Sequence, residues 1–362
     1  MVIVLFQLLF LTTGSVAFPN HISGSKKEDG NAPAMNILVS GHSLTDAAFS
    51  KDLQQLFAAR GEDIAWELHY LPGSSIRQRL HMLESTVSSG SKSGIGQQMG
   101  NILHDPADHH ATKTFDVTII TEQHRVLDAL LWERTISSLM HAHEMLMEAN
   151  PATRVIFLVP WINRSSVNNP TDWISYERAA QPIWACIIGR INVRFTAQGR
   201  LDQIQVLPAA MALAYLADVL WSREDLSGFE GLSPSERVAT LFRDEVHLTP
   251  LGSFYVAALT AAWLEGGSPS LDNVEITPGS DLEMAQARQV HAHALAFLDK
   301  YRSQPPSQDC SLVQRLVFLT NYVNYSQRAY NEPDPGKIGS TLRKISRIIR
   351  FTWRFGIGMP KS

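Results

Sequence analysis

The segment Asn36–Asp46, with the sequence Asn-Ile-Leu-Val-Ser-Gly-His-Ser-Leu-Thr-Asp, decides the fold. Its apolar run Ile37–Val39 is typical of a buried strand, and a helical pattern begins just after Ser43, near Thr45 or Asp46. A hydroxyl at the carboxyl end of a strand lies where ligands of open α/β sheets bind, and nearby backbone N–H groups can stabilise an oxyanion. We therefore predict that Ser43 is a nucleophile, with a turn serine or helix cap as the alternative.

A candidate general base and its acidic partner lie roughly two hundred residues later, in Arg243–Gly252. Asp244 and His247 are three residues apart on a loop that enters a helix, and Pro250 stands in the first turn of that helix. Both side chains can therefore face one serine. Asp244 would fix the imidazole tautomer, while His247 would take the serine proton and pass it to the leaving group.

With these motifs the chain resembles the SGNH or GDSL-type serine hydrolases. The resemblance rests on Gly41–Leu44, on Leu71–Ser75 after the second apparent strand, and on Asp244–His247, and it covers about Asn36 to Leu264. It implies a flavodoxin-like, three-layer α/β/α fold with a parallel sheet and no cofactor.

The same resemblance implies a Ser-His-Asp triad, here Ser43, His247 and Asp244. It also implies an oxyanion hole made by the N–H of the serine, the N–H of a glycine and an asparagine side chain. The glycine corresponds to Gly73. The third donor would follow the third strand.

The sequence departs from the family pattern at that third donor. Where the family carries Gly-x-Asn-Asp, this chain has Thr121–His124. Gln123 aligns with the asparagine and carries the same carboxamide on one more methylene, so we expect it to complete the oxyanion hole, with His124 as the rival. His42 replaces the aspartate of the GDSL motif. These departures suggest a divergent branch and leave open an inactive enzyme.

Strands and helices alternate along the chain in the manner of a parallel α/β sheet. Expected strands are 64–71, 115–121, 154–159 and 204–207, and expected helices are 46–60, 125–149, 176–188, 209–221 and 248–265.

Substrate contacts are expected at the carboxyl ends of these strands. After the fourth strand, Trp161 and Trp173 are candidate stacking platforms for sugar rings, and Arg164 is a candidate partner for a negative substituent. The alternative is that at least one of the tryptophans belongs to the core. His42 and His124 are further candidates for substrate contacts.

The N-terminal segment Val2–Val16 is largely apolar and ends beside the small residues Ser15 and Ala17. This pattern predicts a secretion signal over 1–17, followed by a polar linker over 18–34. The protein would then be secreted or periplasmic. The alternatives are a membrane anchor, for which the apolar run is short, or a cytoplasmic protein with a misassigned start codon, since neither Lys nor Arg follows Met1 closely.

Composition fits an ordinary globular protein of 362 residues, 44% hydrophobic and with a net charge of -4, which excludes a wholly disordered chain. We expect one domain over 35–266 and a helical extension over 267–362. Two cysteines, Cys186 and Cys310, exclude a disulfide framework, although they can pair in an oxidising compartment. Histidines 104, 109 and 110 lie in a polar stretch over 85–114, for which a solvated loop near the site entrance is favoured over a metal site.

The extension contains helical patterns over 281–301, 312–330 and 337–362. The last of these has seven Lys or Arg and no acidic residue, interleaved with apolar side chains. Such a basic amphipathic helix could contact an anionic membrane or a polyanion; the alternative is a helix packed on the domain with its cations in water. The acidic overall balance and the export signal disfavour nucleic-acid binding.

Together these patterns predict a serine esterase that cleaves an acyl ester through Ser43 and an acyl-enzyme. We favour an O-acetyl ester, possibly on a carbohydrate or polysaccharide, because no extended apolar stretch stands out between Gly73 and Asp244. One alternative is an O-acyltransferase with the same triad. Another is an inactive carbohydrate-binding or scaffold protein, since the oxyanion asparagine is missing.

Overall fold

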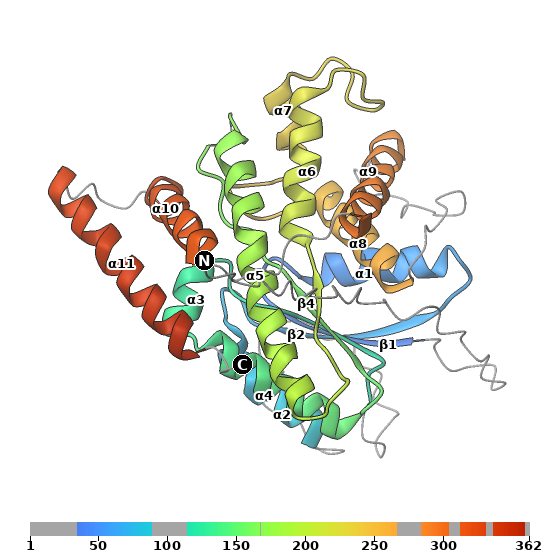
Figure 1. The fold of residues 1–362 in the computed structure, drawn as a ribbon. Helices are drawn as coiled ribbons and strands as arrows, with labels where there is room; N and C mark the ends of the chain where they lie inside the picture. The colour runs from blue at the N-terminus through green and yellow to red at the C-terminus, as the bar shows by residue number, and fades with distance from the viewer. Residues whose placement is uncertain are drawn as a thin grey trace, which may run out of the picture. The chain divides into compact units, whose positions relative to one another are not determined.

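The computed structural model describes residues 35–88, 114–166, 168–265, 284–303, 312–330 and 336–358 (Figure 1). These residues contain a five-stranded parallel sheet in the order β2-β1-β3-β4-β5. This is the strand order of flavodoxin-like doubly wound sheets, so the predicted α/β fold with a parallel sheet is confirmed. The strands are β1 (Met35–Gly41), β2 (Ile64–Tyr70), β3 (Val117–Thr121), β4 (Arg154–Leu158) and β5 (Gln205–Leu207).

Helices lie on both faces of this sheet, as a three-layer arrangement requires (Figure 1). On one face α1 (Ala47–Ala58) packs against α8 (Pro250–Glu265), and on the other α2 (Ile76–Ser88) packs against α4 (Thr135–Ala149). The remaining helices up to this point are α3 (Val126–Trp132), α5 (Thr171–Ala197), α6 (Ala209–Ser222) and α7 (Pro234–Ala239).

The apolar run of β1 forms the centre of the core. Ile37, Leu38 and Val39 are almost fully buried because β1 lies between two neighbours, where Val39 pairs with Leu68 of β2 on one side and Ile119 of β3 on the other. A continuous apolar run without alternation is typical of a parallel strand covered by helices on both faces.

The single long helix predicted over 125–149 is wrong. The structure has two helices, because α3 ends at Trp132 and Arg134 adopts a left-handed backbone conformation with φ of 53° before α4 begins. Between them, the carboxylate of Glu133 accepts hydrogen bonds from Ser75 Oγ and from Arg77 Nη2, both at 2.9 Å. These contacts with the start of α2 hold the break in place.

Helix α7 was not among the predicted elements. Its N-terminus carries a capping box, in which the Ser233 side chain accepts from the N–H of Glu236 and the Glu236 carboxylate accepts from the N–H of Ser233. A serine followed three residues later by a glutamate is a recognised start signal, but six residues are too few to show an apolar stripe.

Three helices follow the sheet, as the pattern predicted: α9 (Met284–Ser303), α10 (Leu312–Ala329) and α11 (Gly336–Gly358). Helix α9 packs against α8, α10 packs against α5, and α11 contacts α3 and α10. The described residues belong to one compact unit. Within α5, Cys186 is disulfide-bonded, and the only other cysteine in the sequence, Cys310, lies outside the described residues.

The predicted signal peptide over 1–17, the linker over 18–34 and the histidines 104, 109 and 110 also lie outside the described residues. In the described ranges, no helix is long and apolar enough to cross a bilayer. The same ranges contain no cluster of His, Cys, Asp and Glu side chains arranged to hold a metal ion.

Candidate active site

Ser43 stands in a tight turn between β1 and α1. The turn is closed by a 2.9 Å hydrogen bond from the N–H of Thr45 to the carbonyl of His42, so Ser43 is one of its two central residues. Asp46 then caps α1 by accepting a 3.0 Å bond from the N–H of Ala48. The predicted strand, turn and helix are confirmed, and they leave the Ser43 side chain partly exposed.

Gly41 is needed for this turn because no side chain fits at its position. A Cβ on Gly41 would collide with the side chain of Thr45 and would touch the methyl group of Thr121. The carbonyl of Gly41 also accepts a 3.3 Å bond from the N–H of Leu71, which ties the nucleophile turn to the chain leaving β2.

Gly73 lies in that second turn and has φ of 64°, a conformation that favours glycine. In the strand order of this sheet, β1 is flanked by β2 and β3, and the connections after β1 and β3 leave toward opposite faces. Ligands of such folds bind at this switch point. The turns carrying Ser43 and Gly73 and the segment Thr121–His124 therefore meet at the edge where a site is expected.

The side chains of Asp244 and His247 are in contact, as the predicted acid-base pair requires. Asp244 Oδ2 lies 2.7 Å from His247 Nδ1, and Asp244 Oδ1 accepts from the N–H groups of Val246 at 2.8 Å and of His247 at 2.7 Å. Burial alone would raise the pKa of Asp244, but these N–H bonds and the imidazole outweigh it and hold the pKa at about 2. The carboxylate is therefore charged at neutral pH. The side chains of Asp244 and His247 are 40% and 29% exposed, so the pair is open to a substrate.

Two residues of the segment after β4 donate hydrogen bonds to the loop Asp244–His247, which we call the acid-base loop. Trp161 Nε1 donates to the carbonyl of Val246, Arg164 N to that of Glu245 and Arg164 Nη2 to that of Asp244, each at 2.8 Å. The guanidinium of Arg164 also lies over the Phe242 ring, 4.3 Å from its centroid. Three successive carbonyls are thereby fixed.

This arrangement corrects three of the predicted substrate contacts. Trp161 and Trp173 are fully buried, and Trp173 Nε1 donates to the carbonyl of Ile162 at 2.9 Å, so neither ring offers a stacking platform. Arg164 is also buried and serves the acid-base loop. Trp161 and Arg164 lie in the segment after β4 and Trp173 lies in the first turn of α5, and all three side chains are buried. The composition of this segment does not show that burial.

His42 is buried too, which contradicts its expected contact with substrate. Its Nε2 lies 2.8 Å from the carbonyl of Glu122 and donates to it, which joins the nucleophile turn to the end of β3. Burial lowers the pKa of His42 to about 3, so the ring is neutral at pH 7.

His124 lies between the rings of His42 and Tyr330. Its ring is 6.4 Å from that of His42 in an edge-to-face arrangement and 6.2 Å from Tyr330, on which it stacks. Burial, the charge of Arg125 and that of His247 lower the pKa of His124 to about 4. A charge on His247 likewise lowers the pKa of His42, which places His247 within electrostatic reach of the residue beside Ser43. No hydrogen bond joins Ser43 to His247 in the described residues, but catalytic hydrogen bonds often tighten only when substrate binds.

A buried ionic network beneath the turns was missed by the sequence analysis. Arg79 of α2 donates to Ser40 Oγ at 3.2 Å, to the carbonyl of Ser74 at 2.8 Å and to the carbonyl of Thr121. One guanidinium thus joins the ends of β1 and β3 to the turn after β2. Burial lowers the pKa of Arg79 to about 10, so it remains charged at neutral pH.

Glu122 is the acidic residue of this network. It is fully buried and accepts from the N–H of Gln123 at 2.7 Å, the N–H of Ile76 at 3.1 Å and the hydroxyl of Thr135 at 2.8 Å. Burial raises the pKa of Glu122, while these three bonds and the charge of Arg79 oppose that shift. Buried Lys, Arg, Asp and Glu cannot be distinguished from exposed ones by sequence, which is why this network carried no signal.

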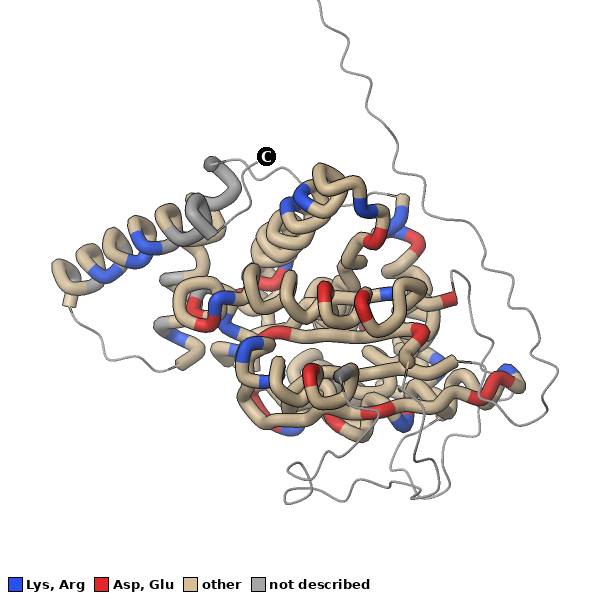
Figure 2. Tube along the Cα trace, turned by 90° about the horizontal axis from the view of Figure 1, so that it is seen from below, with Lys and Arg blue, Asp and Glu red and all other residues tan. Residues whose placement is uncertain are grey.

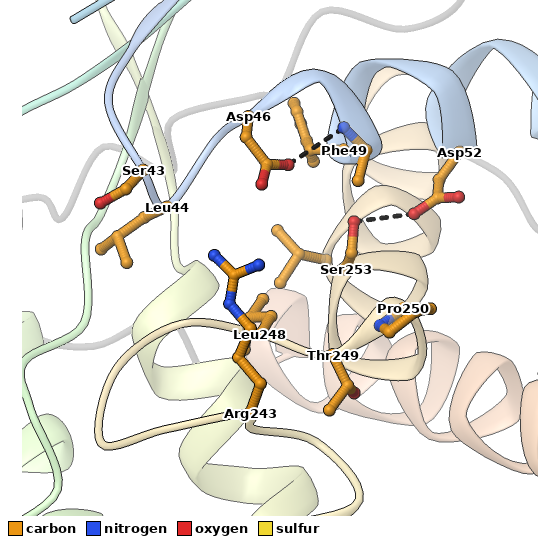
Figure 3. Close-up of a pocket in the computed structure, with 12 residues that line it drawn as sticks. Ser43, Leu44, Asp46, Phe49, Asp52, Arg243, Leu248, Thr249, Pro250 and Ser253 are labelled. Atoms are coloured by element: carbon orange, nitrogen blue, oxygen red, sulfur yellow. Dashed lines mark hydrogen bonds between the residues drawn. The ribbon is translucent and has the colours of Figure 1, made fainter. Parts of the chain in front are cut away.

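A cavity of about 160 Å³ lies against the nucleophile turn, between α1 and α8 (Figure 3). Ser253 Oγ donates a 2.7 Å hydrogen bond to Asp52 at its wall, and burial raises the pKa of Asp52 to about 6. Figure 3 shows the Ser43 hydroxyl directed away from Asp46 and Arg243. Ser43 is one of the residues that line the cavity, so the cavity adjoins the candidate site.

No family model matches the sequence, and no curated protein matches it either. Among solved structures, the fold is similar to that of a DUF4886 family protein from Bacteroides uniformis, with 12% sequence identity and a TM-score of 0.45. That likeness covers 76% of this chain and 97% of the other.

Proposed function

We propose that this protein is a serine esterase of the SGNH type that hydrolyses a short acyl ester. The observation that carries the proposal is the 2.7 Å contact between Asp244 and His247, held rigidly and left accessible at the switch point of the sheet. A surface capping pair would need none of the three bonds that Trp161 and Arg164 donate to the carbonyls of this loop. A base must be fixed to within fractions of an ångström of its nucleophile, so rigidity of this kind suits catalysis.

In the proposed reaction, Ser43 Oγ attacks the ester carbonyl carbon while His247 Nε2 takes its proton. The carbonyl oxygen becomes an oxyanion, stabilised by the N–H groups of Ser43 and Gly73 and by the Gln123 carboxamide. When the tetrahedral intermediate collapses, the alcohol leaves with the proton from His247. Water, deprotonated by His247, then releases the acid and restores Ser43. Asp244 stays ionised throughout, because its pKa is about 2.

A short acyl group is favoured because the large apolar side chains near the acid-base pair are buried. Ile162, Phe242 and Val246, like Trp161, face the core. Because Trp161 and Trp173 are buried, they cannot stack on a sugar ring. An O-acetyl group on a sugar is therefore proposed from the family resemblance alone.

The proposal is tested by hydrolysis of p-nitrophenyl acetate and p-nitrophenyl octanoate by the purified protein. We expect kcat/KM for acetate to exceed that for octanoate by at least about tenfold, since a site shaped for a short acyl group excludes the extra methylenes. A preference for octanoate would contradict the short-acyl assignment. Absence of hydrolysis of both esters would contradict the esterase itself and leave the acyltransferase and the inactive protein.

Gln123 is expected to provide the third oxyanion donor. The backbone N–H of Gln123 donates to the Glu122 carboxylate. Its partly buried carboxamide forms no hydrogen bond within the described residues. We expect Gln123→Ala to lower kcat by about a hundredfold or more with little change in KM, because an oxyanion donor acts in the transition state. Gln123→Asn should retain much of the rate. If Gln123→Ala has no effect and His124→Ala does, His124 holds the role.

A further inference from the structure

Helix α11 exposes an apolar stripe that the proposed esterase does not require. Its exposed members are Ile338 at 80%, Leu342 at 61%, Ile345 at 48%, Ile349 at 62% and Trp353 at 58% of their surface. Spacings of four, three, four and four residues place all five on one face of a helix. Five of the thirteen large apolar side chains exposed in the described residues belong to this one helix. Single exposed apolar residues are ordinary, but a contiguous stripe marks an interaction surface.

The other side of α11 faces the protein. Arg347 donates to Ser326 Oγ of α10 at 3.3 Å, Arg350 lies 6.0 Å from the Trp132 ring of α3, and Ile348 packs against the core. The helix is thus anchored by Arg347, Ile348 and Arg350, while the five exposed apolar side chains lie outside these contacts. Packing on the domain therefore does not explain the stripe.

Charge identifies the partner. Residues 337–362 contain seven Lys or Arg and no Asp or Glu, although the whole chain carries a net charge of -4. In Figure 2, every charged position along the described part of α11 is blue, that is, Lys or Arg. A helix with an apolar stripe containing Trp, low overall hydrophobicity and only positive charges has the composition of helices that lie in the interface of anionic bilayers.

We propose that α11 docks the protein on an anionic lipid bilayer, with the stripe Ile338–Trp353 inserted at the level of the headgroups. The proposal does not depend on esterase activity. Through α10 and Tyr330, which stacks on His124, the docked helix would bring the candidate site close to the bilayer surface.

The test is cosedimentation of the full chain with phosphatidylcholine vesicles, with and without about one third phosphatidylglycerol. We expect binding to the anionic vesicles only, weakened by high salt, and reduced at least about tenfold by Ile345→Ser/Ile349→Ser. A matched control is Val193→Ser/Leu201→Ser, which removes two apolar side chains that are 55% and 92% exposed outside α11. This control should bind like the unmodified protein. All three proteins should unfold at the same temperature, because the exchanged side chains are exposed.

A local probe separates α11 from other membrane-binding segments. An environment-sensitive dye on Ile345→Cys, attached under non-reducing conditions that keep Cys186 in its disulfide, should shift to the blue when anionic vesicles are added. The same dye on Val193→Cys should not. Vesicle binding that leaves the Ile345 dye unchanged would overturn the proposal, as would binding unaffected by the double substitution. A dimer that the double substitution dissociates would instead assign the stripe to a second copy of the chain.

Discussion

Ser43→Ala is expected to lower kcat/KM for p-nitrophenyl acetate by about ten-thousand-fold or more, because the variant loses the atom that forms the acyl-enzyme. His247→Ala should have an effect of similar size, since an alcohol is a poor nucleophile without a base. The measurement is steady-state hydrolysis with the unmodified protein at the same concentration. Ser175→Ala and His141→Ala, at exposed positions distant in sequence from both motifs, are the matched controls and should keep full activity.

The double variant Ser43→Ala/His247→Ala makes this prediction specific to a triad. Residues that act as one unit are not additive, so the double variant should be no slower than either single variant. Asp244→Asn should also be slow, by about a thousandfold or more, because an amide at 2.7 Å from Nδ1 favours the wrong imidazole tautomer. If Ser43→Ala retains the activity of the unmodified protein, Ser43 is not the nucleophile and the esterase proposal fails with it.

The position of Ser43 could be predicted because local signals agree there. An apolar run before it, a glycine that no other residue can replace and a capping aspartate after it all indicate one strand-turn-helix unit. The Asp244 and His247 pair was equally local, since three residues separate the two side chains that meet. Sequence reasoning succeeds where partners are near in the chain.

Errors arose where partners are distant in the chain. The break after α3 depends on Glu133 contacting Ser75 and Arg77, which lie more than fifty residues away. Trp161 was predicted to contact a ligand because it follows a strand. Its indole N–H instead donates to the carbonyl of Val246, eighty-five positions later. Whether an aromatic side chain faces a substrate or the core is decided by tertiary packing, which the local sequence does not carry.

Arg79 illustrates the same limit for charged residues and leads to the largest expected effect on stability. Arg79 belongs to α2, where Arg77 stands two positions earlier, and the sequence does not show which of the two arginines is buried. Arg77 pairs with Glu133 with half of its side chain exposed. Arg79 is buried and donates to two carbonyls and two hydroxyls from three separate segments, and its charge interacts with Glu122. An exposed ion pair contributes little, whereas removing a buried guanidinium leaves several buried acceptors without their donor, which is costly.

We therefore expect Arg79→Met to lower the free energy of unfolding by about 3 to 5 kcal/mol. The substitution removes the cation that acts on the buried Glu122, and the carbonyls of Ser74 and Thr121 lose the guanidinium donor. Urea unfolding followed by circular dichroism measures this. Arg77→Met, the matched control, should cost about 1 kcal/mol or less. Arg79→Met/Glu122→Gln should recover part of the loss, since the stranded charge is removed while most acceptor contacts of position 122 persist. Equal losses for Arg77→Met and Arg79→Met would show that the network does not stabilise the fold, and that the turns carrying Ser43 and Gly73 are held by their backbone bonds alone.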